Sequence, residues 1–113
     1  MAKATAFQGK LNSTIGRKLA ESRTGRFNQS TLAQRVGLTR AAISAVEAGQ
    51  QGVSVETLCK LARALELEPG SLLPDLAELR ELEAAAHAEI LDKVPVDDGR
   101  SADEIVDEFL KGA

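Results

Sequence analysis

Apolar residues recur at three- and four-residue spacings along most of the chain, which is the pattern of amphipathic α-helices. No stretch of convincing length alternates as a half-buried strand does, so the pattern predicts an all-α protein. A first helix is predicted to end near Ser22, before the turn-forming pair Thr24-Gly25. Its apolar face carries Phe7, Leu11, Ile15 and Leu19.

Three shorter helices follow, and each has a recognisable start. Asn28, Thr39 and Ser54 have side chains that suit the capping position of a helix N-terminus. Gly37 and Gly49 end the first two of these helices. The predicted inward-facing residues are Leu32, Ala33 and Val36, then Ile43 and Val46, then Val55, Leu58, Leu61, Ala62 and Leu65, with a short piece at Leu72 and Leu73 before Pro74.

Beyond Pro74 the pattern predicts two more helices. The longer one begins at Asp75 and ends before Pro95, and a polar turn or linker follows at 96–100. Ser101 and Glu104 have the spacing of a capping box, which predicts the start of a last helix. The apolar residues are Leu76, Leu79, Leu82, Ala86 and Ile90 on the longer helix, and Ile105, Val106, Phe109 and Leu110 on the last one.

The segment from Gln29 to Ala48, QSTLAQRVGLTRAAISAVEA, has the properties of two short helices that cross at a steep angle. Ala33 supplies the small residue that a close crossing requires, and Gly37 supplies a residue able to take a positive φ in the turn. Apolar residues at suitable spacings clamp the pair: Leu32, Val36, Leu38, Ile43 and Val46. The outward positions of the second helix, which are then free to enter a major groove, are Arg40, Ala41, Ser44 and Ala45.

Residues from about Ile15 to Leu73 resemble the Cro/C1-type (XRE-type) helix-turn-helix domain, the fold of lambdoid phage repressors. The residues that carry the resemblance are Gln29, Leu32-Ala33, Gly37-Leu38, Ile43-Ser44, Glu47, Gly49, Ser54 to Leu58 and Ala62 to Leu65. The resemblance implies a five-helix, lambda-repressor-like bundle, here followed by an acidic helical C-terminal extension. It also implies a dimer that binds double-stranded DNA at a two-fold related operator.

The resemblance also implies roles for individual residues. Gln29 would lie against the DNA backbone and support the recognition helix. Arg40 would be the first outward residue of that helix, where a guanidinium can bond guanine or, as the alternative, a phosphate. Ala41 and Ala45 offer methyl groups to thymine, and Ser44 can bond a base edge.

Further residues are expected at the DNA backbone or in the structural motif. After Gly49 the family commonly places Lys or Arg, but this chain has Gln50-Gln51-Gly52, so phosphate affinity would depend on Arg17, Lys18 and other residues. The predicted backbone contacts are Asn28, Gln29, Thr39, Arg26, Arg35 and Gln50. In the family a glutamate at the Glu47 position often pairs with an arginine of the first helix, here Arg23, and this pair joins Ala33, Gly37, Ile43 and Val46 in the structural motif.

Charge divides the chain into two halves. Residues 1–63 carry a net charge of +7 and residues 64–113 a net charge of −10. The basic half suits a polyanion, although two solvated surfaces would have the same composition. We therefore divide the chain into a DNA-binding domain (1–73), an amphipathic dimerisation helix (74–94) and an acidic tail with a short helix (95–113). The residues expected at the dimer interface are Leu76, Leu79, Leu82, Ala86 and Ile90.

Dimerisation is not the only way to cover the apolar stripe of the helix from Asp75. The stripe could fold back on its own domain or bind another protein. The apolar face of the last helix, in the tail, could likewise dock on its own chain or in the groove of a protein partner, such as a toxin.

Little in the sequence suggests an enzyme. The single cysteine, Cys59, excludes an internal disulfide and fits a helical apolar stripe, and the single histidine, His87, lies among alanines and acids. We expect no metal, no cofactor and no RNA-stacking platform. No segment resembles a signal peptide or approaches ~18 apolar residues in a row, so a cytoplasmic protein without a membrane span is expected.

The sequence therefore predicts a sequence-specific, duplex-DNA-binding transcriptional regulator, with repression as the expected mode. The alternative is an antitoxin that neutralises a toxin through its acidic C-terminal region and also binds its own promoter.

Overall fold

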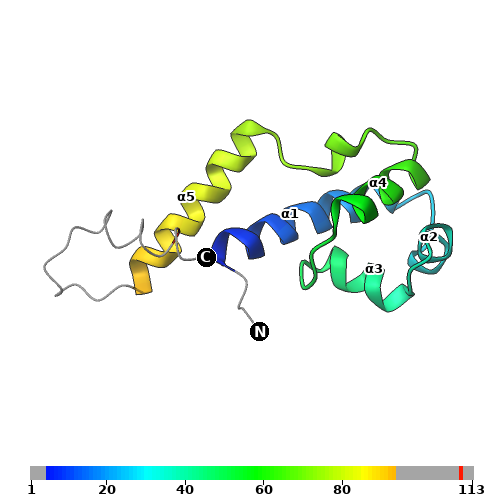
Figure 1. Cartoon of the computed structure of the whole chain (residues 1–113), viewed down its shortest axis with the longest axis horizontal. Helices are drawn as coiled ribbons and strands as arrows, with labels where there is room; N and C mark the ends of the chain where they lie inside the picture. The colour runs from blue at the N-terminus through cyan, green and yellow to red at the C-terminus, as the bar shows by residue number, and fades with distance from the viewer. Residues whose placement is uncertain (1–4, 94–109, 111–113) are drawn as a thin grey trace, which may run out of the picture.

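The computed structural model describes residues 5–93 and Leu110, with only the backbone described at 90–93. The helices are α1 (Ala6–Arg23), α2 (Gln29–Val36), α3 (Arg40–Glu47), α4 (Val55–Ala64), the 3-10 helix η1 (Pro69–Leu72) and α5 (Leu76–Lys93). Figure 1 shows α2, α3 and α4 gathered around one half of α1, while α5 lies along the other half. The predicted all-helical fold is confirmed, and the fifth piece of the bundle is the 3-10 helix η1.

The helix starts are set by the side chains that the sequence indicates. Asn28, Thr39 and Ser54 each accept a hydrogen bond from the backbone N–H three residues on, at 2.7, 3.0 and 3.1 Å. Thr5 does the same for α1, accepting from Gln8 at 3.0 Å, which fixes a start that the apolar pattern leaves open. Each cap satisfies a donor that the helix itself cannot pair.

The core is aliphatic and joins the first four helices to η1. Its fully buried large side chains come from each of these elements or from the residue that ends it: Leu19, Leu32, Ile43, Leu61, Leu65 and Leu72. Burial of one such side chain contributes about 1.5–3 kcal/mol, and most of the stability of short helices in a protein comes from such packing. The inward position predicted for Val55 is wrong, because this residue is 78% exposed: it is the first residue of α4, in a turn that no neighbouring helix covers.

Two close backbone approaches fix α1 against α3 and the loop that follows α3. A Cβ added at Gly16 would lie 2.2 Å from the carbonyl oxygen of Val46, so the backbones of α1 and α3 meet directly at this point. Gly49, at a φ of +76°, lies similarly close to Ser13 of α1. The orientation of α3 therefore depends on two positions without side chains.

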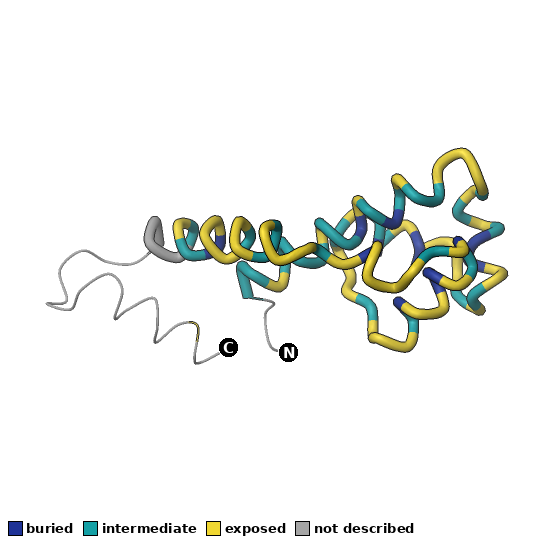
Figure 2. Tube along the Cα trace, turned by 90° about the horizontal axis from the view of Figure 1, so that it is seen from above, coloured by how far each residue is buried: buried dark blue, intermediate teal, exposed yellow. Residues whose placement is uncertain are grey.

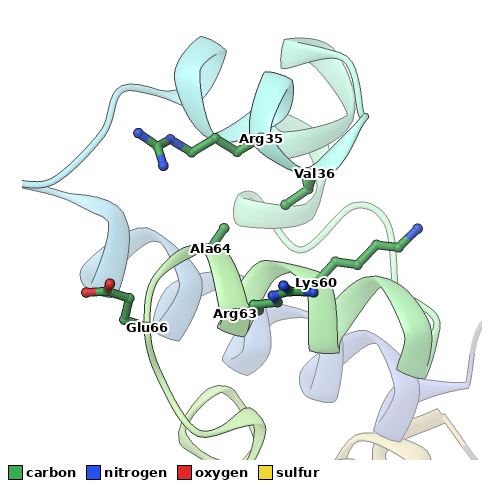
Figure 3. Close-up of a pocket in the computed structure, with 6 residues that line it drawn as sticks. All are labelled: Arg35, Val36, Lys60, Arg63, Ala64 and Glu66. Atoms are coloured by element: carbon green, nitrogen blue, oxygen red, sulfur yellow. The ribbon is translucent and has the colours of Figure 1, made fainter.

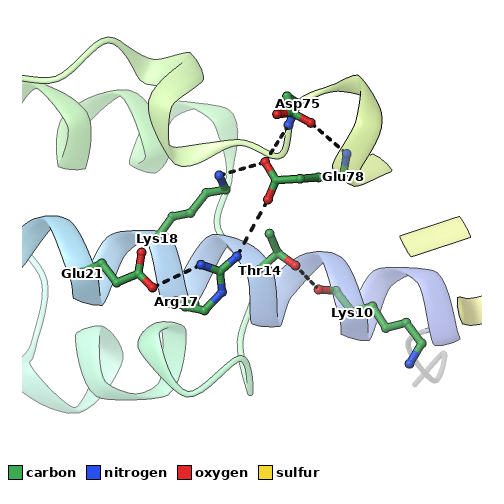
Figure 4. Close-up of polar contacts among 7 residues, drawn as sticks. All are labelled: Lys10, Thr14, Arg17, Lys18, Glu21, Asp75 and Glu78. Carbon is green, nitrogen blue, oxygen red and sulfur yellow. Dashed lines mark hydrogen bonds and ion pairs between the residues drawn. The ribbon is translucent and has the colours of Figure 1, made fainter. Parts of the chain in front are cut away.

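Helix α5 runs antiparallel to α1 and joins it through charged contacts. Lys18 pairs with Glu78 at 3.0 Å near the start of α5, and Lys10 pairs with Glu89 at 3.2 Å near its end. Glu78 and Asp75 also form a reciprocal capping box at the start of α5 (Figure 4). The last helix expected from Ser101 lies outside the described residues apart from Leu110, which is helical.

Much of α5 remains exposed, as the alternating colours of Figure 2 show. Of the stripe expected to form a dimer, Ala86 is buried, Leu79 and Leu82 are half-buried, and Leu76 is 64% exposed. The side chain of Ile90, the fifth residue of the stripe, lies outside the part that the structure describes. Within this single chain, α5 therefore packs on α1, and α1 covers only part of the apolar stripe of α5. The dimerisation role of the stripe stays a prediction.

Candidate nucleic-acid interface

The turn between α2 and α3 is held by backbone hydrogen bonds around Gly37. Gly37 adopts the left-handed conformation, with a φ of 73° and a ψ of 29°. The N–H of Leu38 then donates to the carbonyl of Ala33 at 2.9 Å, which closes the end of α2. The buried Ala33 lets the two short helices approach, while Ile43 and Val46 anchor α3 in the core.

This arrangement leaves one side of α3 open to solvent. Arg40, Ala41 and Ser44 are exposed and Ala45 is half-buried. Arg40 is the first residue of α3. No described residue forms a hydrogen bond or an ion pair with it. The four residues expected to face bases thus lie on the part of α3 that the fold leaves uncovered.

A buried carboxylate links the three helices that surround this face. Glu47, at the end of α3, accepts from the Nε and Nη2 atoms of Arg23 at 2.5 and 2.9 Å. It also accepts from the Nε2 atom of Gln29, the first residue of α2, at 3.0 Å. The Glu47 side chain is only 8% exposed, and Arg23 donates further to the carbonyl of Phe27. The Arg23–Glu47 pair expected from the resemblance is therefore present, and it includes Gln29 as well.

These contacts set the charge state of the pair. Burial disfavours the charged form of Glu47, but the hydrogen bonds from Arg23 and Gln29 and the nearby guanidinium outweigh it, so the pKa of this carboxyl lies below its usual value. The hydrogen bond to Glu47 likewise raises the pKa of Arg23, against the opposing effect of burial. Both groups are charged at neutral pH.

The network also orients the amide of Gln29. An ionised carboxylate can only accept hydrogen bonds, so the nitrogen of the amide must face Glu47. One N–H of that nitrogen is used by Glu47, and the second stays available to an outside acceptor such as a phosphate oxygen.

Other residues expected at the DNA backbone have partners inside the chain. Arg26 donates through Nη1 to the carbonyl of Leu65, at the end of α4. The guanidinium of Arg35 lies 4.4 Å from the centre of the Phe27 ring. The side-chain oxygens of Asn28 and Thr39 serve as caps, while Gln50 is exposed beyond the end of α3.

The basic residues of α1 that could add phosphate affinity are also engaged. Lys18 donates to Glu78, and Arg17 lies between Glu21 at 3.1 Å and Glu78 at 3.8 Å (Figure 4). Hydrogen bonds from Lys18 and from the N–H of Asp75 hold the pKa of Glu78 below its usual range. Glu78 of α5 is thus a counter-ion for both cations, and Arg17 has Glu21 of its own helix as a second one.

A basic cleft of about 580 Å³ lies between α2 and α4, with Arg35, Lys60 and Arg63 as its cations (Figure 3). Lys60 pairs with Glu56 at 3.2 Å. Val36 of α2 and Ala64 of α4 supply the apolar part of the lining, and Glu66 also lines the cleft.

Two functional positions had a weak signal in the sequence or none. Gly16, which lets α3 reach α1, is marked only as a glycine inside a helical pattern. The link between Gln29 and Glu47 spans 18 positions and has no local signature. Within the described residues no group of side chains has the make-up of a metal site, and none of the helices is long and apolar enough to cross a membrane.

Comparison with known proteins agrees with this geometry. A family model described as helix-turn-helix matches residues 26–72. Among solved structures, the restriction-modification controller protein C.AhdI from Aeromonas hydrophila is 39% identical, with a TM-score of 0.56 over 58% of this chain and 97% of that one. A hypothetical transcription factor from Neisseria, NHTF, is 26% identical, with a TM-score of 0.56 over 66% of this chain and 87% of that one. No curated protein matches the chain.

The fold, the turn at Gly37 and these matches define a helix-turn-helix protein of the kind that binds DNA. The chain belongs to the XRE-type helix-turn-helix family of DNA-binding transcriptional regulators.

Proposed function

We propose that the chain is a homodimeric, sequence-specific repressor that reads duplex DNA with the exposed face of α3. The observation that carries the proposal is the state of Arg40. It is exposed at the N-terminus of α3 and has no partner among the described residues, whereas Arg23, Arg26 and Arg35 are each engaged. A free guanidinium at this place can bond guanine O6 and N7 together.

The test compares Arg40→Ala with a matched control, Arg63→Ala. Arg63 is also an exposed arginine, but it lines the cleft between α2 and α4. Binding is measured to a duplex selected from random DNA and to an unrelated duplex. Arg40→Ala should cost about 1–3 kcal/mol on the selected duplex and much less on the unrelated one. An equal loss on both would show a phosphate contact, and no binding by the unmodified chain at low salt would refute DNA binding itself.

Ala41, Ser44 and Ala45 complete the proposed base-reading face. Gln29 is proposed to donate its remaining N–H to a phosphate, with Asn28, Thr39 and Gln50 beside the same DNA strand. Because a phosphate contact carries no sequence information, Gln29→Ala should weaken binding to both duplexes by the same factor. A loss confined to the selected duplex would instead place Gln29 at a base.

A homodimer is proposed because one recognition helix reads too few base pairs to select a genomic site. The division into residues 1–73, 74–94 and 95–113 is part of this proposal. Within the single chain, the apolar residues left open at the start of α5 are Leu73, 41% exposed, and Leu76, 64% exposed. They supply the part of the proposed dimer surface that α1 does not cover.

Sedimentation of the full chain and of Leu76→Glu tests this assembly. We expect a dimer that the substitution weakens by at least about tenfold, with Arg80→Glu, an exposed residue of the same helix, as the control. A monomer at tens of micromolar, roughly the range in which even a weak dimer is populated, would refute it. The antitoxin alternative would instead show a toxin bound to the acidic tail.

A further inference from the structure

A second site lies away from the exposed face of α3, in the cleft between α2 and α4. Its volume is about 580 Å³, and ligand sites of proteins typically measure about 300–1,000 Å³. We name this site the α2–α4 cleft. Its lining comes from the last turn of α2, the second half of α4 and one residue beyond α4, and includes no residue of α3: Arg35, Val36, Lys60, Arg63, Ala64 and Glu66.

The charge of the α2–α4 cleft is mostly positive. Its lining holds three cations and one carboxylate, that of Glu66. The whole chain carries a net charge of −3, so this excess of positive charge is local. The rest of the lining is the apolar pair Val36 and Ala64. A cleft with charges of mainly one sign and apolar walls concentrates the electric field and attracts ligands of the opposite sign.

The cations have donors available to a ligand. No described residue forms a hydrogen bond or an ion pair with Arg35 or Arg63. The guanidinium of Arg35 lies 4.4 Å from the centre of the Phe27 ring, and this stacking restrains its plane while the N–H donors at its edge stay open. Lys60 pairs with Glu56 at 3.2 Å, but the two side chains are 56% and 78% exposed, so water screens the pair and a ligand can replace it.

The positions of the charged groups indicate the shape of the ligand. Figure 3 shows the charged ends of Arg35 and Lys60 directed toward opposite ends of the cleft, with Arg63 between them. An anion that engages all three must therefore be extended and carry several negative groups along its length. Guanidinium groups suit carboxylates and phosphates in particular, because they bind both through two parallel hydrogen bonds.

We propose that the α2–α4 cleft binds a small, extended polyanion, a polycarboxylate or an oligophosphate, which bridges the two helices. Arg35 and Arg63 donate paired hydrogen bonds to it, Lys60 adds a third positive charge, and Glu66 lowers the affinity by repulsion. The ligand holds α2, the helix that begins at Gln29, against α4. Since only the folded chain presents both walls, the bound ligand raises the melting temperature. The site does not depend on the proposed DNA contact.

The first experiment titrates the ¹⁵N-labelled full chain with tripolyphosphate and, separately, with citrate at constant ionic strength. We expect saturable shifts of the backbone amides of residues 35–37 and 60–66, with a Kd of about 1 mM or lower for at least one of the two probes. A response to tripolyphosphate alone assigns the site to phosphates, and a response to citrate alone assigns it to carboxylates. Shifts that do not saturate with either probe would overturn the proposal.

Anions with a single negative group test the requirement for an extended ligand. Acetate and orthophosphate should bind at least about tenfold more weakly than the better of the two probes, because they engage one cation at a time. Equal affinities at the same ionic strength would overturn the proposal.

Substitutions with opposite effects test whether the lining itself binds the probe. Arg63→Gln should weaken binding at least about fivefold, whereas Glu66→Gln should strengthen it about two- to threefold because it removes the carboxylate. Arg80→Gln, at an exposed arginine of α5, is the matched control and should change nothing. A gain in affinity cannot come from a folding defect, so Glu66→Gln remains informative if Arg63→Gln folds poorly.

The outcomes against the proposal are distinct from a failure of DNA binding. Equal losses from Arg63→Gln and Arg80→Gln, or no gain from Glu66→Gln, would overturn it. A larger loss from Arg40→Gln than from Arg63→Gln would place the probe at α3 and would also overturn it, while the proposed DNA contact of Arg40 would stand.

Discussion

Replacing Gly16 by alanine tests the claim that direct backbone contact positions α3. An alanine Cβ would lie 2.2 Å from the carbonyl oxygen of Val46 and 2.8 Å from that of Glu47. Ordinary contacts begin near 3.5 Å, so α1 and α3 would have to separate by roughly 1 Å. Both atoms that it meets belong to the backbone of α3 and cannot rotate away.

The size of the effect follows from two opposing contributions. Overpacking in a well-packed core costs about 1–3 kcal/mol, and a rigid backbone places this case at the upper end. Alanine regains about 1 kcal/mol of helix propensity over glycine. We therefore expect Gly16→Ala to lower the free energy of unfolding by about 2 kcal/mol. Gly9→Ala, in the same helix, meets nothing within 4 Å and should raise it by about 0.5–1 kcal/mol.

Urea denaturation followed by far-ultraviolet circular dichroism measures both variants, because the chain has no Trp or Tyr to report by fluorescence. Gly16→Ala should also weaken DNA binding, since α3 moves with the contact. A Gly16→Ala chain as stable as Gly9→Ala would show that α1 and α3 do not meet in this way.

Three further predictions follow from individual contacts. Gly37→Ala should lower the free energy of unfolding by about 1–2 kcal/mol in the same urea assay. The cost comes from the φ of +73° alone, because an added Cβ would meet nothing within 4 Å. An unchanged midpoint would contradict the left-handed turn. The lowered pKa of Glu47 means that this carboxylate stabilises the fold above the ordinary glutamate pKa near 4.3, and that the stabilisation is lost as the pH falls through the folded-state pKa. Glu47→Gln should therefore flatten the acid side of a curve of stability against pH. An unchanged acid side would refute the network around Glu47. Lys18→Gln should leave the salt dependence of DNA binding unchanged, because Lys18 faces Glu78 of α5, whereas a slope shallower by about 0.9 would mean that it neutralises a phosphate.

Local chemistry made much of the fold predictable. The caps at Asn28, Thr39 and Ser54 and the left-handed turn at Gly37 each depend on a few consecutive residues, and all four are found where the sequence places them. The apolar period likewise identified the buried side chains of α2 and α3. The prediction for Val55 was wrong because a period shows which face a residue shares and does not show where the neighbouring helix ends.

Contacts between residues far apart in the sequence were harder to predict. Arg17 and Lys18 of α1 were natural candidates for phosphate binding, yet both pair with Glu78 of α5, which lies 60 positions from Lys18 in the sequence. Glu66 is another example: it takes a φ of 57° after α4, a place where glycine would be expected, and no local pattern indicates it. The Arg23–Glu47 pair could be anticipated only through the family resemblance, because 24 residues separate the two side chains.

These contacts give the charge division of the chain a structural basis. The basic half suggested a broad polyanion-binding surface, but several of its cations are neutralised or directed inward: Lys10 and Lys18 by α5, Arg17 by Glu21 and Glu78, and Arg23 by Glu47. Part of the acidic half is thus an internal counter-ion for α1. A surface with fewer free cations attracts DNA less strongly irrespective of sequence, because nonspecific affinity depends on phosphate neutralisation. If the proposed function holds, discrimination between sites depends more on the face of α3, where Arg40 has no partner among the described residues.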